Sequence, residues 1–325
     1  MQPAQSPETA KPPLDPLTIE AMRARDYPGS EVVIEQTLPS AQSYNRYLVS
    51  YKSEGLKIYA LLTIPIGLKP LSGWPVVIFN HGYIPPEQYQ TTQRYEAYVD
   101  VFARAGYVVF KPDYRGHGNS DGSPEGAYHS PAYTVDVLNA ISSVKKLTDL
   151  KNKSGQLIID SEKIGMWGHS MGGHITLRSM VVSKEIKAGV IWAGVVASYD
   201  DLMNRWNRKT PWKPSAREQA NYRPSRQNLI EKYGTFEQNP DFWNSISPIH
   251  FVSEISGPVQ LHHGTIDESV PIEFSQGLKE ALEKAGKPVE FYTYEGADHN
   301  LSGTAFNLAA QRSLEFFNKH LKQLT

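Results

Sequence analysis

The sequence predicts an α/β protein with a mostly parallel central sheet, helices on both faces and an inserted helical cap. Short, continuously apolar runs such as 75–80 and 188–192 are typical of strands buried on both faces. Amphipathic helical patterns lie between these runs, and such alternation indicates a parallel sheet. With 325 residues, 40% of them hydrophobic, the chain is long enough to bury a sizeable core.

The elements follow one another in a regular order from residue 31 onward. Residues 31–36, 44–52 and 56–65 are β-branched and aromatic runs separated by Pro, Ser and Gly, which predicts an antiparallel meander. The alternating part then has predicted strands at 75–80, 107–112, 163–167, 188–192, 258–262 and 289–294. Predicted helices lie at 91–105, 132–147, 171–182, 271–285 and 304–321.

Two stretches depart from this alternation. Residues 1–30 are rich in proline and show no periodicity before Leu17, so we expect a flexible tail there. Residues 198–247 contain eight aromatic residues and are too long for a loop between two strands. We expect them to form a helical cap over the end of the sheet, with 31–197 and 248–325 making the core domain.

Composition excludes several classes of function. The chain has 33 Lys and Arg against 34 Asp and Glu, which gives no electrostatic reason to expect a nucleic acid as partner. It has no cysteine, so disulfides, zinc–cysteine sites and a cysteine nucleophile are absent. The apolar stretch 188–197 is far shorter than the ~20 residues of a membrane-spanning helix. No metal-binding pattern such as H-E-x-x-H occurs, and we expect no cofactor.

The sharpest local motif is Gly168-His169-Ser170-Met171-Gly172, between a predicted strand and a predicted helix. In that setting G-x-S-x-G forms a nucleophile elbow, a turn so tight that the serine is strained and the glycines leave room for it. The Ser170 oxygen would then project from the carboxyl edge of the sheet. The Met171 N–H, at the start of the helix, would point the same way and bind a developing oxyanion.

A serine nucleophile needs a base and an orienting acid, which follow it in the chain in this kind of fold. Asp267 comes just after the strand 258–262, and His299 comes just after the strand 289–294. Both would therefore reach the same sheet edge as Ser170. Glu268 and Asp298 remain alternatives for the acid.

The loop after the strand 75–80 starts His81-Gly82-Tyr83, and the Tyr83 N–H is the expected second oxyanion donor. We interpret most other polar residues near these motifs as structural. Arg115 is expected to join loops by a buried ion pair. Five other histidines near the motifs are expected to support the structure by packing or local hydrogen bonds; these are His117, His169, His174, His262 and His263.

Together these motifs resemble the α/β-hydrolases. More narrowly, the chain is similar to the relatives of prolyl oligopeptidase that border on the dienelactone hydrolases and the feruloyl esterases. The matching pieces are HGY at 81–83, DYRGHGNSDG at 113–122, GHSMGG at 168–173, HHGTIDESVP at 262–271 and GADHN at 296–300. The resemblance implies a triad of Ser170, Asp267 and His299, with oxyanion N–H groups from Tyr83 and Met171.

The expected function is a serine carboxylesterase acting on a small-molecule ester with an aromatic, feruloyl-like acyl group or a short-chain one. Trp206, Trp212, Tyr222 and Trp243 of the cap would line an aromatic or apolar acyl pocket, as for a feruloyl-like ester, although any one of them could instead be cap core. The alternatives are an exopeptidase or amidase acting on short peptides and a non-catalytic binding module. Too few residues precede the strand 75–80 for the β-propeller of the related peptidases. The resemblance of residues 1–30 to mature exported proteins favours an extracytoplasmic location over a cytoplasmic one.

Overall fold

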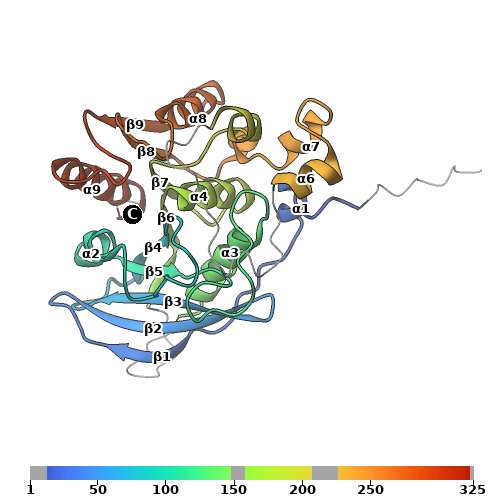
Figure 1. Ribbon diagram of the computed structural model, residues 1–325. Helices are drawn as coiled ribbons and strands as arrows, with labels where there is room; N and C mark the ends of the chain where they lie inside the picture. Colours follow the sequence, from blue (N-terminus) through green and yellow to red (C-terminus); the bar gives the residue numbers. More distant parts are fainter. Residues whose placement is uncertain (1–12, 148–157, 207–225, 323–325) are drawn as a thin grey trace, which may run out of the picture.

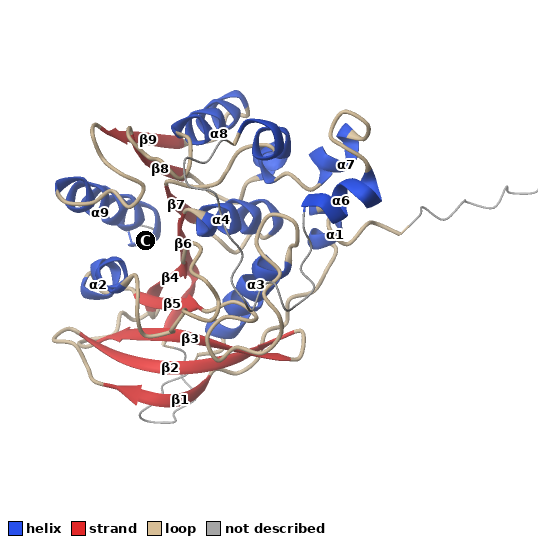
Figure 2. Ribbon diagram, viewed as in Figure 1, coloured by secondary structure: helices blue, strands red, loops and turns tan. Residues whose placement is uncertain are grey.

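The computed structural model describes residues 13–147, 158–206 and 226–322 (Figure 1). In these ranges one nine-stranded sheet runs in the order β1-β2-β3-β5-β4-β6-β7-β8-β9, and Figure 2 shows its strands in red. The first three strands pair antiparallel, β3 pairs antiparallel with β5, and every pair from β5 to β9 is parallel. The strands are β1 (Val33–Leu38), β2 (Tyr44–Ser53), β3 (Leu56–Pro65), β4 (Trp74–Asn80), β5 (Val108–Pro112), β6 (Ile159–His169), β7 (Ala188–Trp192), β8 (Val259–Gly264) and β9 (Val289–Tyr294).

Helices cover both faces of the sheet, which confirms the predicted fold class. Figure 1 shows α2 and α9 on one face and α3, α4 and α8 on the other. The helical elements are α1 (Ile19–Arg23), α2 (Glu96–Arg104), α3 (Ala132–Val144), α4 (Met171–Val182), η1 (Asp201–Arg205), α6 (Arg226–Tyr233), α7 (Pro240–Ser245), η2 (Pro248–Glu254), α8 (Ile272–Lys284), α9 (Thr304–Phe317) and η3 (Asn318–Lys322).

The continuous apolar runs are strands because each face of the sheet is buried. Along β4, Val76 and Ile78 belong to the core under α3, α4 and α8, whereas Val77 and Phe79 belong to the core under α2 and α9. Alternate side chains of a strand point to opposite faces, so both sets must be apolar. This two-sided burial fixes the strand ends from which the site is built.

Several predicted boundaries shift. The helix expected over 91–105 begins only at Glu96, because Arg94 and Tyr95 have φ angles of 61° and 55°, in the left-handed region. β6 begins at Ile159 rather than at 163, and α3 ends at Val144 rather than at 147.

The N-terminal segment is less free than expected. Within the predicted tail 1–30, α1 buries Ile19 and Met22 in the core, and the Arg23 guanidinium donates two hydrogen bonds of 2.9 and 2.7 Å to the Val181 carbonyl at the end of α4. The described part of this stretch is therefore packed on the domain. Residues 1–12 lie outside the described ranges.

The described parts of the expected cap, 198–206 and 226–247, are largely helical. α6 and α7 share a small apolar cluster around Trp243, which is fully buried. The Tyr233 hydroxyl of α6 donates to Asp15 at 2.6 Å, so α6 contacts the N-terminal segment, as Figure 1 shows for α6 and α1.

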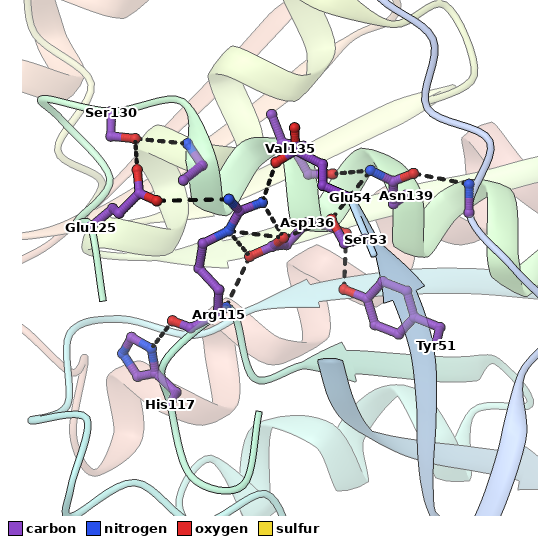
Figure 3. A network of polar contacts seen from close by, with 12 residues as sticks. Tyr51, Ser53, Glu54, Arg115, His117, Glu125, Ser130, Val135, Asp136 and Asn139 are labelled. Carbon is purple, nitrogen blue, oxygen red and sulfur yellow. Dashed lines mark hydrogen bonds and ion pairs between the residues drawn. The ribbon is translucent and has the colours of Figure 1, made fainter. Parts of the chain in front are cut away.

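Arg115 joins loops through ion pairs, as the sequence predicts (Figure 3). Its guanidinium lies 2.7 Å from the fully buried carboxylate of Asp136 on α3 and 2.7 Å from Glu54 in the β2–β3 turn. Glu125 lies 3.7 Å away. Because it holds α3, the β2–β3 turn and the loop after β5 together, Arg115 acts in the scaffold and not in a substrate site.

In the described ranges, no helix has both the length and the apolar character needed to cross a membrane.

Candidate active site

The predicted triad and oxyanion residues lie at or just after the carboxyl ends of β4, β6, β8 and β9. The chain passes from β4 to β5 on one side and then crosses to β6 on the other, which makes a topological switch point. In open α/β sheets, ligands bind at the strand ends beside such a point. Local sequence and topology therefore select the same edge.

Ser170 occupies a strained turn between β6 and α4. Its φ and ψ are 55° and −119°, a conformation that is costly for a residue with a side chain. A Cβ added at Gly172 would overlap the carbonyl oxygen of Asn80, and one added at Gly168 would overlap that of Gly172. Only glycine fits at these two positions, so the elbow geometry predicted from the motif is present.

Asp267 and His299 meet in a direct hydrogen bond. Nδ1 of His299 lies 2.7 Å from Oδ2 of Asp267, whose side chain is 1% exposed, while the His299 side chain is 18% exposed. Because Nδ1 donates to the carboxylate, the neutral imidazole keeps a lone pair on Nε2, as a general base requires.

The Asp267 carboxylate is saturated with donors. Oδ1 accepts the N–H groups of Ser269 and Val270 at 2.8 and 2.9 Å, and Nε2 of His263 lies 3.1 Å from Oδ2. Burial alone would raise the pKa of Asp267, but the hydrogen bonds from His263, His299 and Val270 outweigh it and hold the pKa well below its usual range. The carboxylate therefore stays charged and can stabilise an imidazolium.

The two alternative acids have other positions. Asp298 accepts the backbone N–H groups of Asn300 and Ser302 and the Ser302 hydroxyl, so it shapes its own loop. Glu268 is exposed. Of the three candidates, only Asp267 has a hydrogen bond to His299 in the described ranges.

The loop after β4 passes close to the serine. A Cβ added at Gly82 would lie 3.2 Å from the Cβ of Ser170, so the backbone next to Tyr83 touches the elbow. Met171 is buried and is the first residue of α4. Both expected oxyanion donors therefore belong to segments that adjoin Ser170.

Stacked rings and a buried polar cluster support this loop. The His81 ring stacks between Tyr89 and Tyr114, with centroid separations of 4.4 and 4.3 Å. The Tyr89 hydroxyl donates to Asp113 at 2.9 Å, and Thr91 also donates to Asp113. Burial raises the pKa of Asp113 to about 6. These contacts fix the segment that carries Gly82 and Tyr83.

The other buried histidines make local hydrogen bonds. Nδ1 of His174 lies 3.0 Å from the Val195 carbonyl, and His262 lies between Tyr294 and Gln260. Burial lowers the pKa of His174 well below its usual range and that of His262 to about 3. Both rings are therefore neutral. Sequence reasoning missed that His263 contacts the acid, because a strand-end histidine gives no local signal of its partner.

The residues of the expected cap that were predicted to bind substrate have different positions. The Trp206 indole donates to the Ser269 carbonyl at 2.9 Å, two residues from Asp267, so it borders the acid loop. Trp243 is 0% exposed and donates to the Gly234 carbonyl, which corrects its expected role, because a fully buried ring cannot line a pocket. Trp212 and Tyr222 lie outside the described residues.

Within the described parts of the chain, no group of three or more His, Cys, Asp or Glu side chains is arranged to hold a metal ion.

The fold and this strand-end arrangement define an α/β-hydrolase. A family model described as BD-FAE matches residues 68–282, most of the chain, and the protein therefore belongs to that family of α/β-hydrolases. This finding confirms the resemblance to serine hydrolases inferred from the motifs.

Among curated proteins, the chain is 26% identical over 273 residues to the uncharacterized peptidase YtmA of Bacillus subtilis, covering 82% of this chain and 91% of YtmA. It is 23% identical over 251 residues to human dipeptidyl peptidase 8, covering 76% of this chain but only 25% of that protein. The likeness thus extends over nearly all of one relative and a quarter of the other.

Solved structures of an esterase and of a peptidase share the fold. The acetyl xylan esterase from Paenibacillus sp. R4 superposes with a TM-score of 0.64 at 17% identity, covering 93% of this chain and 92% of that one. An acylaminoacyl peptidase bound to a chloromethyl ketone has a TM-score of 0.64 at 20% identity, covering 87% of this chain and 43% of that one. At these identities the likeness shows the fold alone.

Proposed function

We propose that this hydrolase cleaves carboxylic esters through an acyl-enzyme formed on Ser170. The observation that carries the proposal is the 2.7 Å hydrogen bond between Asp267 and His299, at the sheet edge where Ser170 occupies a strained elbow. A buried, charged carboxylate that accepts the Nδ1–H of an imidazole orients the ring and allows its Nε2 to act as the base for a serine hydroxyl.

The reaction has two steps. Nε2 of His299 takes the proton of the Ser170 hydroxyl as its oxygen attacks the ester carbonyl, and the N–H groups of Tyr83 and Met171 stabilise the oxyanion. His299 then returns the proton to the leaving alcohol, and a water molecule activated in the same way releases the acid. Loss of one oxyanion donor typically costs about 3–4 kcal/mol of transition-state stabilisation.

Ser170→Ala tests the nucleophile. We expect the variant to lose hydrolysis of p-nitrophenyl esters and labelling by a fluorophosphonate, while its circular dichroism and melting temperature stay close to those of the wild type. Turnover near the wild-type rate would refute the assignment of Ser170. A wild type that takes no label would support the binding-module alternative.

A second candidate function is hydrolysis of short peptides or aminoacyl amides, which the peptidase named among the curated relatives favours. Matched p-nitrophenyl esters and p-nitroanilides of the same acyl groups separate the two activities. We expect the ratio of kcat/KM for an ester to kcat/KM for the matching anilide to exceed the ratio of their uncatalysed hydrolysis rates. Higher anilide turnover, after that correction, would favour a peptidase.

For the acyl group we propose an aromatic or apolar class, with Trp206 as one wall of its pocket. Its position against the acid loop and its ring contact with Tyr128 support this choice. Trp206→Ala would raise KM for a hydroxycinnamoyl ester more than for an acetyl ester, whereas equal effects would assign Trp206 to packing. The extracytoplasmic location stays a prediction, which cell fractionation tests.

A further inference from the structure

Three consecutive hydrogen bonds join the loop after β4 to the loop that carries His299. The Tyr95 hydroxyl accepts the Gly82 N–H at 2.9 Å and lies 2.7 Å from Nδ1 of His169. Nε2 of His169 in turn lies 3.0 Å from the carbonyl oxygen of His299. The chain of contacts begins one residue before Tyr83, passes through the residue before Ser170 and ends on the backbone of the catalytic base.

The direction of each bond is fixed by chemistry. A carbonyl oxygen only accepts, so Nε2 of His169 carries a proton. Burial, with a smaller electrostatic contribution from the nearby His299, lowers the pKa of His169 to about 3, so the ring is neutral and Nδ1 is an acceptor. The Tyr95 O–H must therefore donate to Nδ1, which leaves its oxygen to accept the Gly82 N–H. Each donor and each acceptor in this series of hydrogen bonds is therefore used once.

The backbone is distorted where Tyr95 enters this arrangement. Arg94 and Tyr95 both have positive φ, which is unusual for one large side chain and more so for two in succession. A Cβ added at Gly82 would lie 2.6 Å from the Tyr95 hydroxyl oxygen and 3.2 Å from Nδ1 of His169. The three groups are thus packed together as well as hydrogen-bonded. In the first turn of α2, the Tyr98 hydroxyl also donates to the Asn300 carbonyl at 3.0 Å.

We propose that Tyr95 and His169 are positioning residues that fix the oxyanion loop and the His299 loop relative to Ser170. This inference rests on the proposed function, since it assigns the roles of oxyanion donor to Tyr83 and of base to His299. Tyr95 and His169 each hold a backbone group whose displacement would misplace a catalytic group, and a misplacement of about 1 Å can cost 100-fold in rate.

We call the three hydrogen bonds that join Gly82, Tyr95, His169 and His299 the relay. Tyr95→Phe removes only the hydroxyl that takes part in two of them. We expect kcat on a p-nitrophenyl ester to fall roughly 10- to 100-fold while KM changes little, because positioning acts on the transition state. Tyr107→Phe is the matched control: its buried hydroxyl donates to Asn318 at 2.9 Å, at the start of β5 and away from the site. We expect it to lower the melting temperature similarly and to leave kcat within about twofold.

Two variants of His169 test the donor–acceptor requirement. The amide of Gln carries one acceptor and one donor at a spacing similar to that of the two ring nitrogens, whereas Leu carries neither. His169→Gln should therefore keep more kcat than His169→Leu. If Tyr95→Phe does not fold, this comparison carries the test. Equal activity in the Gln and Leu variants would refute the relay.

A double variant and a labelling experiment complete the test. Because both residues act through one chain of bonds, Tyr95→Phe combined with His169→Leu should be no slower than the slower single variant, whereas multiplicative losses would refute the relay. Fluorophosphonate labelling separates the two proposals. An unlabelled wild type would refute the serine mechanism and the relay with it. A wild type and Tyr95→Phe labelled at equal rates would refute the relay alone.

Discussion

Asp136→Ala should destabilise the protein through the charge that it leaves behind on Arg115. In the wild type the fully buried Asp136 carboxylate accepts hydrogen bonds from the backbone N–H, Nε and Nη2 of Arg115, at 2.7–3.2 Å, and from the Ser53 hydroxyl at 2.7 Å (Figure 3). Breaking a buried ion pair from one side costs about 3–5 kcal/mol of unfolding free energy. Arg115 keeps Glu54 at 2.7 Å, so we expect the lower end of that range.

We therefore expect Asp136→Ala to lower the unfolding free energy by about 3 kcal/mol. With an unfolding entropy near 2.1 cal/mol/K per residue, this loss lowers the melting temperature by about 4–5 °C. Thermal unfolding followed by circular dichroism measures it. Glu283→Ala, which removes an exposed pair with Lys279, is the control and should cost under about 0.5 kcal/mol. Replacing both partners, as Arg115→Met with Asp136→Leu, should recover part of the loss. The reasoning would be refuted by an Asp136→Ala variant as stable as the control, or by a loss that disappears in about 0.5 M salt.

Three further predictions concern the site and its support. Asp267→Asn should lower kcat about 10³- to 10⁴-fold with KM little changed, because the imidazole loses its charged partner; a fall of less than about tenfold would exclude Asp267 as the acid. His262 is neutral in the fold, with a pKa lowered from 6.5 to about 3, so the unfolded chain takes up a proton that the native state does not, and stability falls as pH drops from about 6.5 toward 3. Between pH 6 and 4 the unfolding free energy of the wild type should therefore fall more steeply than that of His262→Gln, by up to about 1.4 kcal/mol per pH unit, and parallel curves would contradict this. Gly172→Ala should prevent folding or activity because its Cβ would overlap the Asn80 carbonyl. Gly277→Ala, in an open part of α8, should instead stabilise the protein by about 0.5–1 kcal/mol. A melting temperature that is higher for Gly172→Ala than for Gly277→Ala would overturn the steric argument.

The sequence predicts those features that depend on local pattern. The elbow at Ser170 follows from a buried strand, two glycines and a helix start, all within a few residues, and the structure shows the expected strain there. The first three strands are recognisable because β-branched runs are separated by turn residues. Strand–helix alternation likewise fixes the parallel sheet and hence the edge that carries the site.

Features that depend on distant contacts are not readable in this way. The choice among Asp267, Glu268 and Asp298 needs the position of His299, which only the packing of β8 beside β9 supplies. Tyr95 fits a helical pattern in the sequence, yet its contacts with Gly82 and His169 hold it in a left-handed conformation that delays the start of α2. The short helix α1 is below the length at which periodicity can be detected.

The donors around Asp267 have a consequence for complementation by small molecules. Ser269, Val270 and His263 hold the carboxylate without help from His299. Trimming His299 to glycine would leave a space beside an acceptor that is still oriented for a ring N–H. Free imidazole added to that variant could bind in this space and donate its N–H to Asp267. We expect activity to rise with imidazole concentration and then to saturate. The extent of this recovery would measure how well the Asp267 carboxylate is oriented when the His299 side chain is absent.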